Sequence, residues 1–166
     1  MNNQSLFFTF LTAIVVLLIA FNLLILYAKK RKIKTENTNI SLVIWYSTIL
    51  VPFFLLLKPA LNMIENSIEL LIFSNSVDNT FISVMEKILI YTGLTFLFTI
   101  AIFLLIEKIS EYILNKRDVS IEIENNNISY FVFKLIISTL FIYSLLTVYE
   151  DFLKWFLPVF NTPFYH

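Results

Sequence analysis

The stretch "LFFTFLTAIVVLLIAFNLLILYA", residues 6–28, decides the fold class of this 166-residue chain. It carries no charged side chain, and Asn22 is its one amide. A helix that rises 1.5 Å per residue needs about 20 apolar residues to cross a hydrocarbon layer about 30 Å thick. The stretch therefore predicts a helix that crosses a membrane. Because the chain opens with "MNNQSLFF", without a basic segment or a cleavage site, we expect a retained anchor rather than a removed signal peptide.

Three further apolar stretches extend this prediction, at residues 40–57, about 84–106, and 128–148. Hydrophobic residues make up 58% of the chain and charged residues only 14%, whereas an average soluble domain has about 25% charged residues. Most of the surface must then contact lipid. We expect an all-α membrane protein in which residues 1–166 form one domain with four transmembrane helices.

Basic residues predict the orientation, because Lys and Arg accumulate in short cytoplasmic loops. The loop 29–39 holds Lys29, Lys30, Arg31, Lys32 and Lys34. The loop 108–127 adds Lys108, Lys116 and Arg117. The other side receives Lys58, Lys87 and Lys154. We therefore expect both loops in the cytoplasm and both termini outside it, in a plasma membrane for which the bacterial inner membrane is the expected case.

Two polar hexapeptides, "ENTNIS" at 36–41 and "ENNNIS" at 124–129, stand 88 residues apart, and each precedes an apolar stretch. The same shift places Lys29 on Arg117. Each half then contains one span, a basic loop, an Asn-rich segment and a returning span. We interpret the chain as a duplicated two-helix hairpin, with repeat one at about 6–73 and repeat two at about 84–158, related by an axis along the membrane normal.

The hexapeptides also predict how the second span of each half begins. Asn39 and Asn127, or their neighbours Thr38 and Asn126, are placed to cap the free N–H groups of these helices. A glutamate stands just ahead in each copy, where the positive end of the helix dipole favours negative charge. A ligand-binding role for the same Asn, Glu and Ser residues is the alternative.

Two polar-aromatic segments are expected on the extracytoplasmic side. After span two, "KPALNMIENSIELLIF" places apolar side chains on one helical face and Asn and Glu on the other, which predicts a short amphipathic helix lying in the membrane interface. After span four, "YEDFLKWFLP" has the composition of an aromatic belt. We expect Trp45, Tyr46 and Trp155 to act as interfacial anchors.

Charges at membrane depth indicate function or pairing, because burying them in hydrocarbon is costly. Lys134 lies about two turns into span four, and Glu107 and Glu111 lie one turn apart near the end of span three. Since adjacent spans run in opposite directions, the three residues share a depth. We predict an ion pair of Lys134 with Glu107 or Glu111. Its role is either structural, including simple snorkelling of Lys134, or the movement of ions or protons.

The remaining polar groups within the spans are few. Asn22 is expected to hydrogen-bond between helices, within one chain or across an oligomer. Thr92, Thr95 and Thr99 are expected to satisfy their own helix. The single glycine, Gly93, leaves no GxxxG pair.

Composition argues against catalysis and cofactors. The chain has no Cys, and its one His is His166 at the end, so thiolate chemistry, a zinc site and a Ser-His-Asp triad lack their residues. No phosphate-binding glycine loop occurs. With 12 basic and 12 acidic residues, the chain has no net positive charge that would attract a nucleic acid. We expect no catalytic, cofactor-binding or metal-binding residues.

Two classes of function survive. The first is a non-enzymatic membrane subunit that self-assembles, or that anchors or senses for a larger membrane complex. The second is a small oligomeric pore or membrane-perturbing effector of the phage-defence or toxin type, in which Lys134, Glu107 and Glu111 line the path. An immunity-type membrane protein is a further alternative with the sequence features of the first class. The expected partners are the lipid bilayer, further copies of the chain, or a membrane or peripheral protein.

Overall fold

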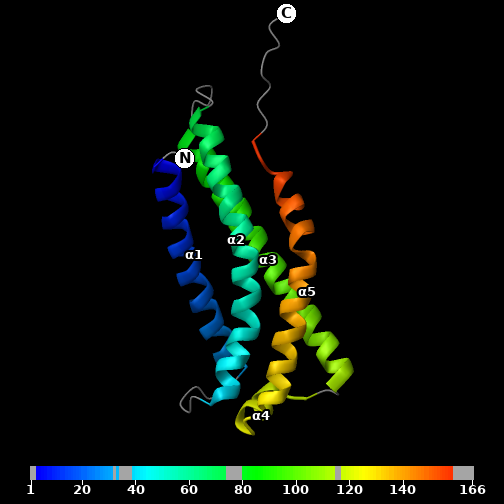
Figure 1. Ribbon diagram of the computed structural model, residues 1–166. Helices are drawn as coiled ribbons and strands as arrows, with labels where there is room; N and C mark the ends of the chain where they lie inside the picture. Colours follow the sequence, from blue (N-terminus) through cyan, green and yellow to red (C-terminus); the bar gives the residue numbers. More distant parts are fainter. Residues whose placement is uncertain (1–2, 32, 34–38, 74–79, 115–116, 159–166) are drawn as a thin grey trace, which may run out of the picture.

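The computed structural model describes residues 3–31, 33, 39–73, 80–114 and 117–158, and within them all regular structure is helical. The helices are α1 (Asn3–Lys30), α2 (Ile40–Phe73), α3 (Thr80–Leu114), α4 (Val119–Glu124) and α5 (Ile128–Lys154) (Figure 1). Four of them, all but α4, are long and apolar enough to cross a membrane. The predicted all-α fold with four candidate spans is thereby confirmed, and it indicates an integral membrane protein.

Helices α2 and α3 are longer than the predicted spans. They contain 34 and 35 residues, or about 51 Å and 53 Å at 1.5 Å per residue, which exceeds a hydrocarbon layer of about 30 Å. Residues 58–73, expected as a separate short helix, continue α2 without a break and include Pro59. Packing explains the continuity, because Ile64 and Ile68 of this segment are fully buried in the protein core.

The helices pack around α2. Helix α5 lies along α2, α3 lies against both of them, and α1 packs chiefly on α2 at the edge of the molecule (Figure 1). Helices α1 and α3, which the 88-residue shift makes equivalent, therefore have different neighbours. The start of α1 and the end of α5 lie at one end of the molecule, and α4 lies at the other (Figure 1). We call these the terminal end and the α4 end.

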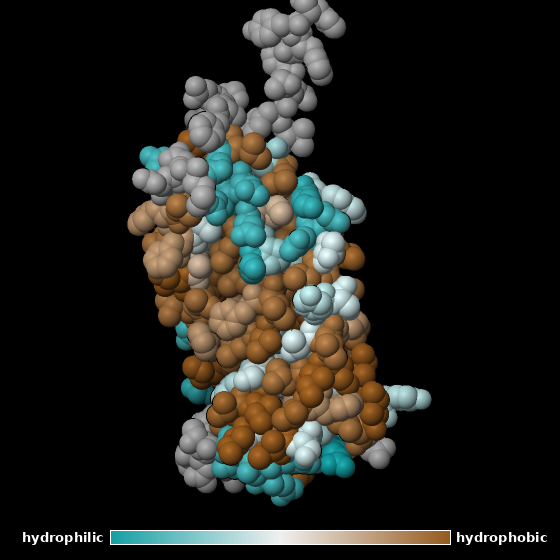
Figure 2. Space-filling model, viewed as in Figure 1, coloured by the Kyte–Doolittle hydropathy of each residue, from teal (hydrophilic) through white to brown (hydrophobic). Residues whose placement is uncertain are grey.

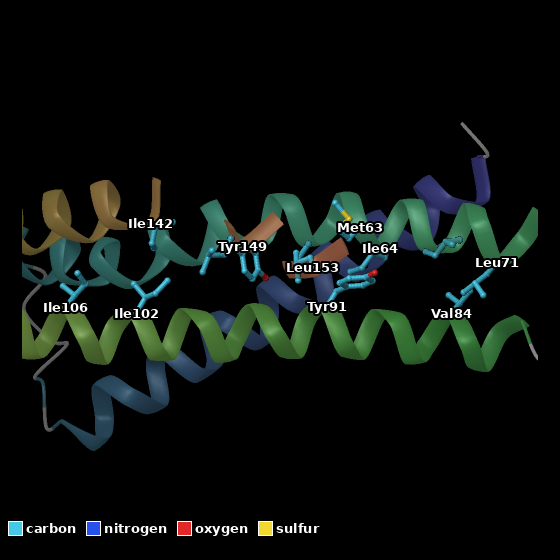
Figure 3. Packing of buried hydrophobic residues seen from close by; sticks show 13 residues of the cluster. Met63, Ile64, Leu71, Val84, Tyr91, Ile102, Ile106, Ile142, Tyr149 and Leu153 are labelled. Atoms are coloured by element: carbon cyan, nitrogen blue, oxygen red, sulfur yellow. The ribbon is translucent and has the colours of Figure 1, made fainter. Parts of the chain in front are cut away.

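The main core fills the space between α2, α3 and α5 toward the terminal end. Ile64, Tyr91 and Leu153 are fully buried there, and Figure 3 shows their side chains meeting between the helices. Two buried hydroxyl contacts cross this core: Ser67 Oγ donates to Tyr91 Oη at 3.2 Å, and Thr95 Oγ1 lies 2.9 Å from Tyr149 Oη. The tyrosine hydroxyls are thus satisfied without water.

The surface has the distribution expected of a membrane protein. On the face shown in Figure 2, hydrophobic residues cover most of the middle of the molecule, and hydrophilic residues gather toward its two ends. Large apolar side chains such as Leu26, Leu97 and Leu140 are exposed on this belt. An exposed belt of this kind suits contact with lipid and does not suit contact with water.

Candidate functional site

A buried ion pair lies near the α4 end, between α3 and α5. Lys134 Nζ is 3.3 Å from Glu107 Oε1, and the two side chains are 5% and 14% exposed. The antiparallel directions of α3 and α5 bring the residues to the same depth, as their positions in the sequence predict. The ammonium group also lies 4.7 Å from the centre of the Tyr130 ring, which adds a cation–π attraction in a desolvated place.

Arg31 is a third member of this cluster. Its Nη2 lies 3.6 Å from Glu107 Oε2, and its Nε donates to Tyr27 Oη at 3.0 Å. The hydrogen bond to Tyr27 is the main reason that the pKa of Arg31 lies above its usual value, with a smaller contribution from Glu107. Glu107 therefore bridges two cations, and the cluster of Arg31, Glu107 and Lys134 carries one surplus positive charge.

Glu111 is not part of the cluster. It lies one turn beyond Glu107 on α3 and pairs with Lys108, whose Nζ is 3.2 Å from Glu111 Oε2. The Lys108 side chain is exposed, so this pair contributes little to stability. Of the two partners considered for Lys134, the structure thus brings only Glu107 to it.

A proline in α2 leaves a backbone carbonyl free to accept a hydrogen bond beside the ion pair. Pro52 has no N–H, which leaves the carbonyl of Thr48 without its helical donor. Ser138 Oγ of α5 donates to this carbonyl at 3.4 Å. A cavity of about 10 Å³ lies next to these groups and reaches Glu107 and Lys134, which is room for about one water molecule. The cavity therefore connects the ion pair with the contact between Ser138 and the Thr48 carbonyl.

The two Asn-rich segments meet at the α4 end, and one of them caps both helices. Asn127 Oδ1 accepts from the Tyr130 N–H at 3.3 Å and caps α5. Asn126, which has a φ of 49°, accepts from the Ser41 N–H at 3.2 Å at the start of α2. The Asn39 side chain instead donates to the Ile123 carbonyl at 3.5 Å, while its backbone carbonyl starts α2. Thr38 and Glu36 lie outside the described residues.

Short helix α4 supports this capping loop. Asp118 accepts hydrogen bonds from the hydroxyl and the N–H of Ser120, which lower the pKa of its carboxyl group. Glu122 pairs with Arg117 at 3.5 Å and accepts from Asn127 Nδ2. These contacts hold the segment that carries Asn126 and Asn127 against the ends of α2 and α5.

The expected aromatic anchors have different environments. Trp45 is buried inside the bundle, because its indole ring stacks on Tyr27 with 6.0 Å between ring centres. Tyr46 is half-buried beside it. Trp155, at the terminal end of α5, is exposed. Only Trp155 thus has the free surface that an interfacial anchor needs, and Trp45 acts in packing.

Asn22 of α1 and three threonines of α3 donate hydrogen bonds within their own helices. Thr92, Thr95 and Thr99 donate to carbonyls four residues earlier, as expected. Asn22 Nδ2 donates to the Leu18 carbonyl at 2.7 Å, and its side chain is exposed on the outer surface of α1. It therefore makes no bond to another described helix, unlike the interhelical contact that we expected within one chain.

Sequence reasoning missed three residues that complete the site: Arg31, Asn126 in its role for α2, and Ser138. Arg31 was counted only as a loop charge. Pro52 was the available signal for Ser138, because a proline inside a span implies a donor elsewhere. Within the described residues no three His, Cys, Asp or Glu side chains gather in a way that suits a metal ion. No family model, curated protein or solved structure matches this chain.

Proposed function

We propose that this protein is a non-catalytic membrane subunit that assembles with itself through the outer face of α1. The observation that carries the proposal is Asn22, an exposed carboxamide within an otherwise apolar helix. A polar group facing hydrocarbon is unfavourable, and Asn side chains in such helices hydrogen-bond across helices. A second copy of α1 supplies a matching group.

The residues around Asn22 form a regular seam. Moving along α1, exposed side chains follow one another at steps of four, three, four and three residues. The members of this α1 seam are Leu11, Val15, Leu18, Asn22 and Ile25. The 4–3 spacing is that of the contact positions of paired helices, and a single Asn among them specifies the register.

Two copies of the chain in one membrane can meet along this seam. Copies inserted in the same direction have parallel α1 helices, so each residue of the seam faces its equivalent across a two-fold axis. Asn22 of one copy then faces Asn22 of the other, an interaction of about 1 kcal/mol in a membrane. Apolar packing along Leu11 to Ile25 supplements it.

We further propose that the α4 end faces the cytoplasm, with both termini outside, in a plasma membrane of the bacterial inner-membrane type. Supporting this, Lys29, Lys30 and Arg31 lie at the α4 end together with Lys108 and Arg117. Lys58, Lys87 and Lys154 are the basic residues nearer the terminal end. The excess of Lys and Arg on one side favours that side for the cytoplasm.

The finer architecture is also a proposal. A duplicated hairpin is supported by the sequence match of the two hexapeptides, and Ser41 and Asn126, one from each, are hydrogen-bonded at the α4 end. An interfacial position for the outer part of α2 is supported by its exposed Asn62 and Asn66, opposite the buried Ile64 and Ile68.

Native mass spectrometry of the purified protein in mild detergent tests the assembly. We expect the parent to form a homodimer, and we expect the Asn22→Leu dimer to dissociate already at a protein concentration about fivefold higher than the parent does, because a loss of about 1 kcal/mol raises Kd about fivefold. Ser144→Leu is the matched control, because Ser144 is also exposed and bonds only within its own helix. Equal dissociation of all three proteins, or a monomeric parent, would refute the proposal.

A second candidate function, a small oligomeric pore or membrane-perturbing effector, is favoured by the water-sized cavity beside Lys134. In this alternative the assembled copies conduct ions, and the charged cluster lines or gates the path. Conductance of the purified assembly in planar bilayers separates the two. A conductance that Lys134→Leu abolishes while the oligomer persists favours the pore, and a silent bilayer favours the structural subunit.

A further inference from the structure

A second surface of α1 borders a deep apolar cleft between α1, α2 and α3. Its volume is about 380 Å³, within the range of about 300–1,000 Å³ found for small-molecule sites. Leu24, Phe53, Phe96 and Phe103 supply much of the wall. The cleft lies on the side of α1 away from the α1 seam, because Ala20 and Leu24 in its wall stand two positions, about 200°, from Asn22.

The cleft is elongated along the helices. On α1 its wall runs from Ala20 to Arg31, about 16 Å, and on α3 from Phe96 to Leu104, about 12 Å. The rings of Phe53 and Phe96, 5.3 Å apart, lie toward the terminal end of this wall. Exposed Ile100 and Leu104 are also part of it, so the cleft opens sideways to the surrounding bilayer.

The mouth toward the α4 end is positively charged. Arg31 lines the cleft there, with its side chain 48% exposed. The carboxylate nearest to it, Glu107, is shared with Lys134, and the next acidic group is that of Asp118. Lys29 and Lys30 directly precede Arg31 and are exposed. Lys29, Lys30 and Arg31 are thus three consecutive cations at this end of α1, and Arg31 is the one of them that lines the cleft.

These features point to a lipid with a negative headgroup. We propose that the cleft holds one acyl chain of an anionic glycerophospholipid, whose phosphate contacts Arg31. The apolar wall, the lateral opening and the cation at headgroup depth match the parts of such a molecule, and basic side chains beside a transmembrane helix attract anionic lipids.

The test is lipid retention, measured by native mass spectrometry after delipidated protein is mixed with phosphatidylglycerol or with phosphatidylcholine of the same acyl chains. We expect one phosphatidylglycerol per chain, bound about fivefold or more tightly than phosphatidylcholine. Arg31→Gln should remove the preference and Arg31→Lys should keep most of it. Lys108→Gln is the control, because Lys108 is 80% exposed and does not line the cleft.

A second pair of variants tests the cleft itself. Ile100→Trp places a large ring at the opening and should reduce binding of both lipids, whereas Leu97→Trp, on the same helix but outside the cleft, should not. Both positions are exposed, so folding is preserved, which circular dichroism verifies. Equal retention of the two lipids by the parent, or equal binding by the two Trp variants, overturns the proposal. An oligomer that Ile100→Trp dissociates overturns it in favour of a protein occupant.

Discussion

Lys134 in α5 and Asn22 in α1 lie at comparable depths but have opposite surroundings. Lys134 is about 9 Å from the α4 end of its helix, and Asn22 is about 12 Å from the α4 end of α1. Lys134 points inward and meets Glu107, whereas Asn22 points outward and bonds only within its own helix. The difference follows from helix position: α5 packs on α2 and α3, and α1 packs chiefly on α2.

The comparison teaches how this protein treats polar groups in a membrane. Lys134 and Ser138 of α5 face neighbouring helices and find partners on them. Asn22, on the outer face of the edge helix α1, remains on the surface. Asn22 thus marks the face on which we propose that a second copy packs.

Removing Glu107, the partner of the inward-facing Lys134, should have the largest effect on stability. Glu107→Leu leaves the buried Lys134 without its counter-charge, and we expect a loss of about 3 kcal/mol in the free energy of unfolding. Titration with sodium dodecyl sulfate in mixed micelles measures it. The double variant Glu107→Leu/Lys134→Leu should recover most of the loss, because no charge is left buried.

Glu111→Leu is the matched control for that experiment, since Glu111 pairs only with exposed Lys108 and should change stability by less than about 1 kcal/mol. Equal losses of unfolding free energy for Glu107→Leu and Glu111→Leu would show that the ion pair with Lys134 stabilises the fold no more than an exposed ion pair does. A double variant as unstable as the single one would point to packing of the Glu107 side chain instead.

An intermediate effect is expected at the cap of α2. Asn126→Gly removes the acceptor of the Ser41 N–H and permits the same positive φ. Loss of one hydrogen bond predicts a decrease of about 1 kcal/mol in unfolding free energy. Asn125→Gly serves as the control, because Asn125 caps the end of α4 through its backbone N–H. No difference between the two variants would contradict a cap supplied by the second half of the chain.

Hydropathy was sufficient to predict the four spans, because the membrane imposes a minimum length on every apolar helix. It did not predict that α2 continues through Pro59 to Phe73. That continuity depends on the burial of Ile64 and Ile68 against other helices, which only the packed structure provides.

The sequence predicts a contact of the site where two residues need only lie at the same depth in the membrane on adjacent helices. Lys134 and Glu107 meet because α3 and α5 run in opposite directions and place them at one level. Arg31 was not predictable in this way, since its approach to Glu107 depends on how α1 crosses α3. Trp45 shows the same limit: its position suits the membrane interface, but stacking on Tyr27 draws it inside the bundle.

The central claim is that two copies meet along the α1 seam, and disulfide cross-linking in intact membranes tests it most directly. The chain contains no Cys, so Leu18→Cys and Ile25→Cys each introduce the only thiol. Disulfides require Cα atoms within about 7 Å. Oxidation should therefore link these variants into dimers and leave Ile19→Cys as monomers, because Ile19 is exposed but lies about 100° from Leu18 and about 120° from Ile25 around α1. Cross-links at Ile19 as strong as those at Leu18 and Ile25, or none at any position, would contradict the account.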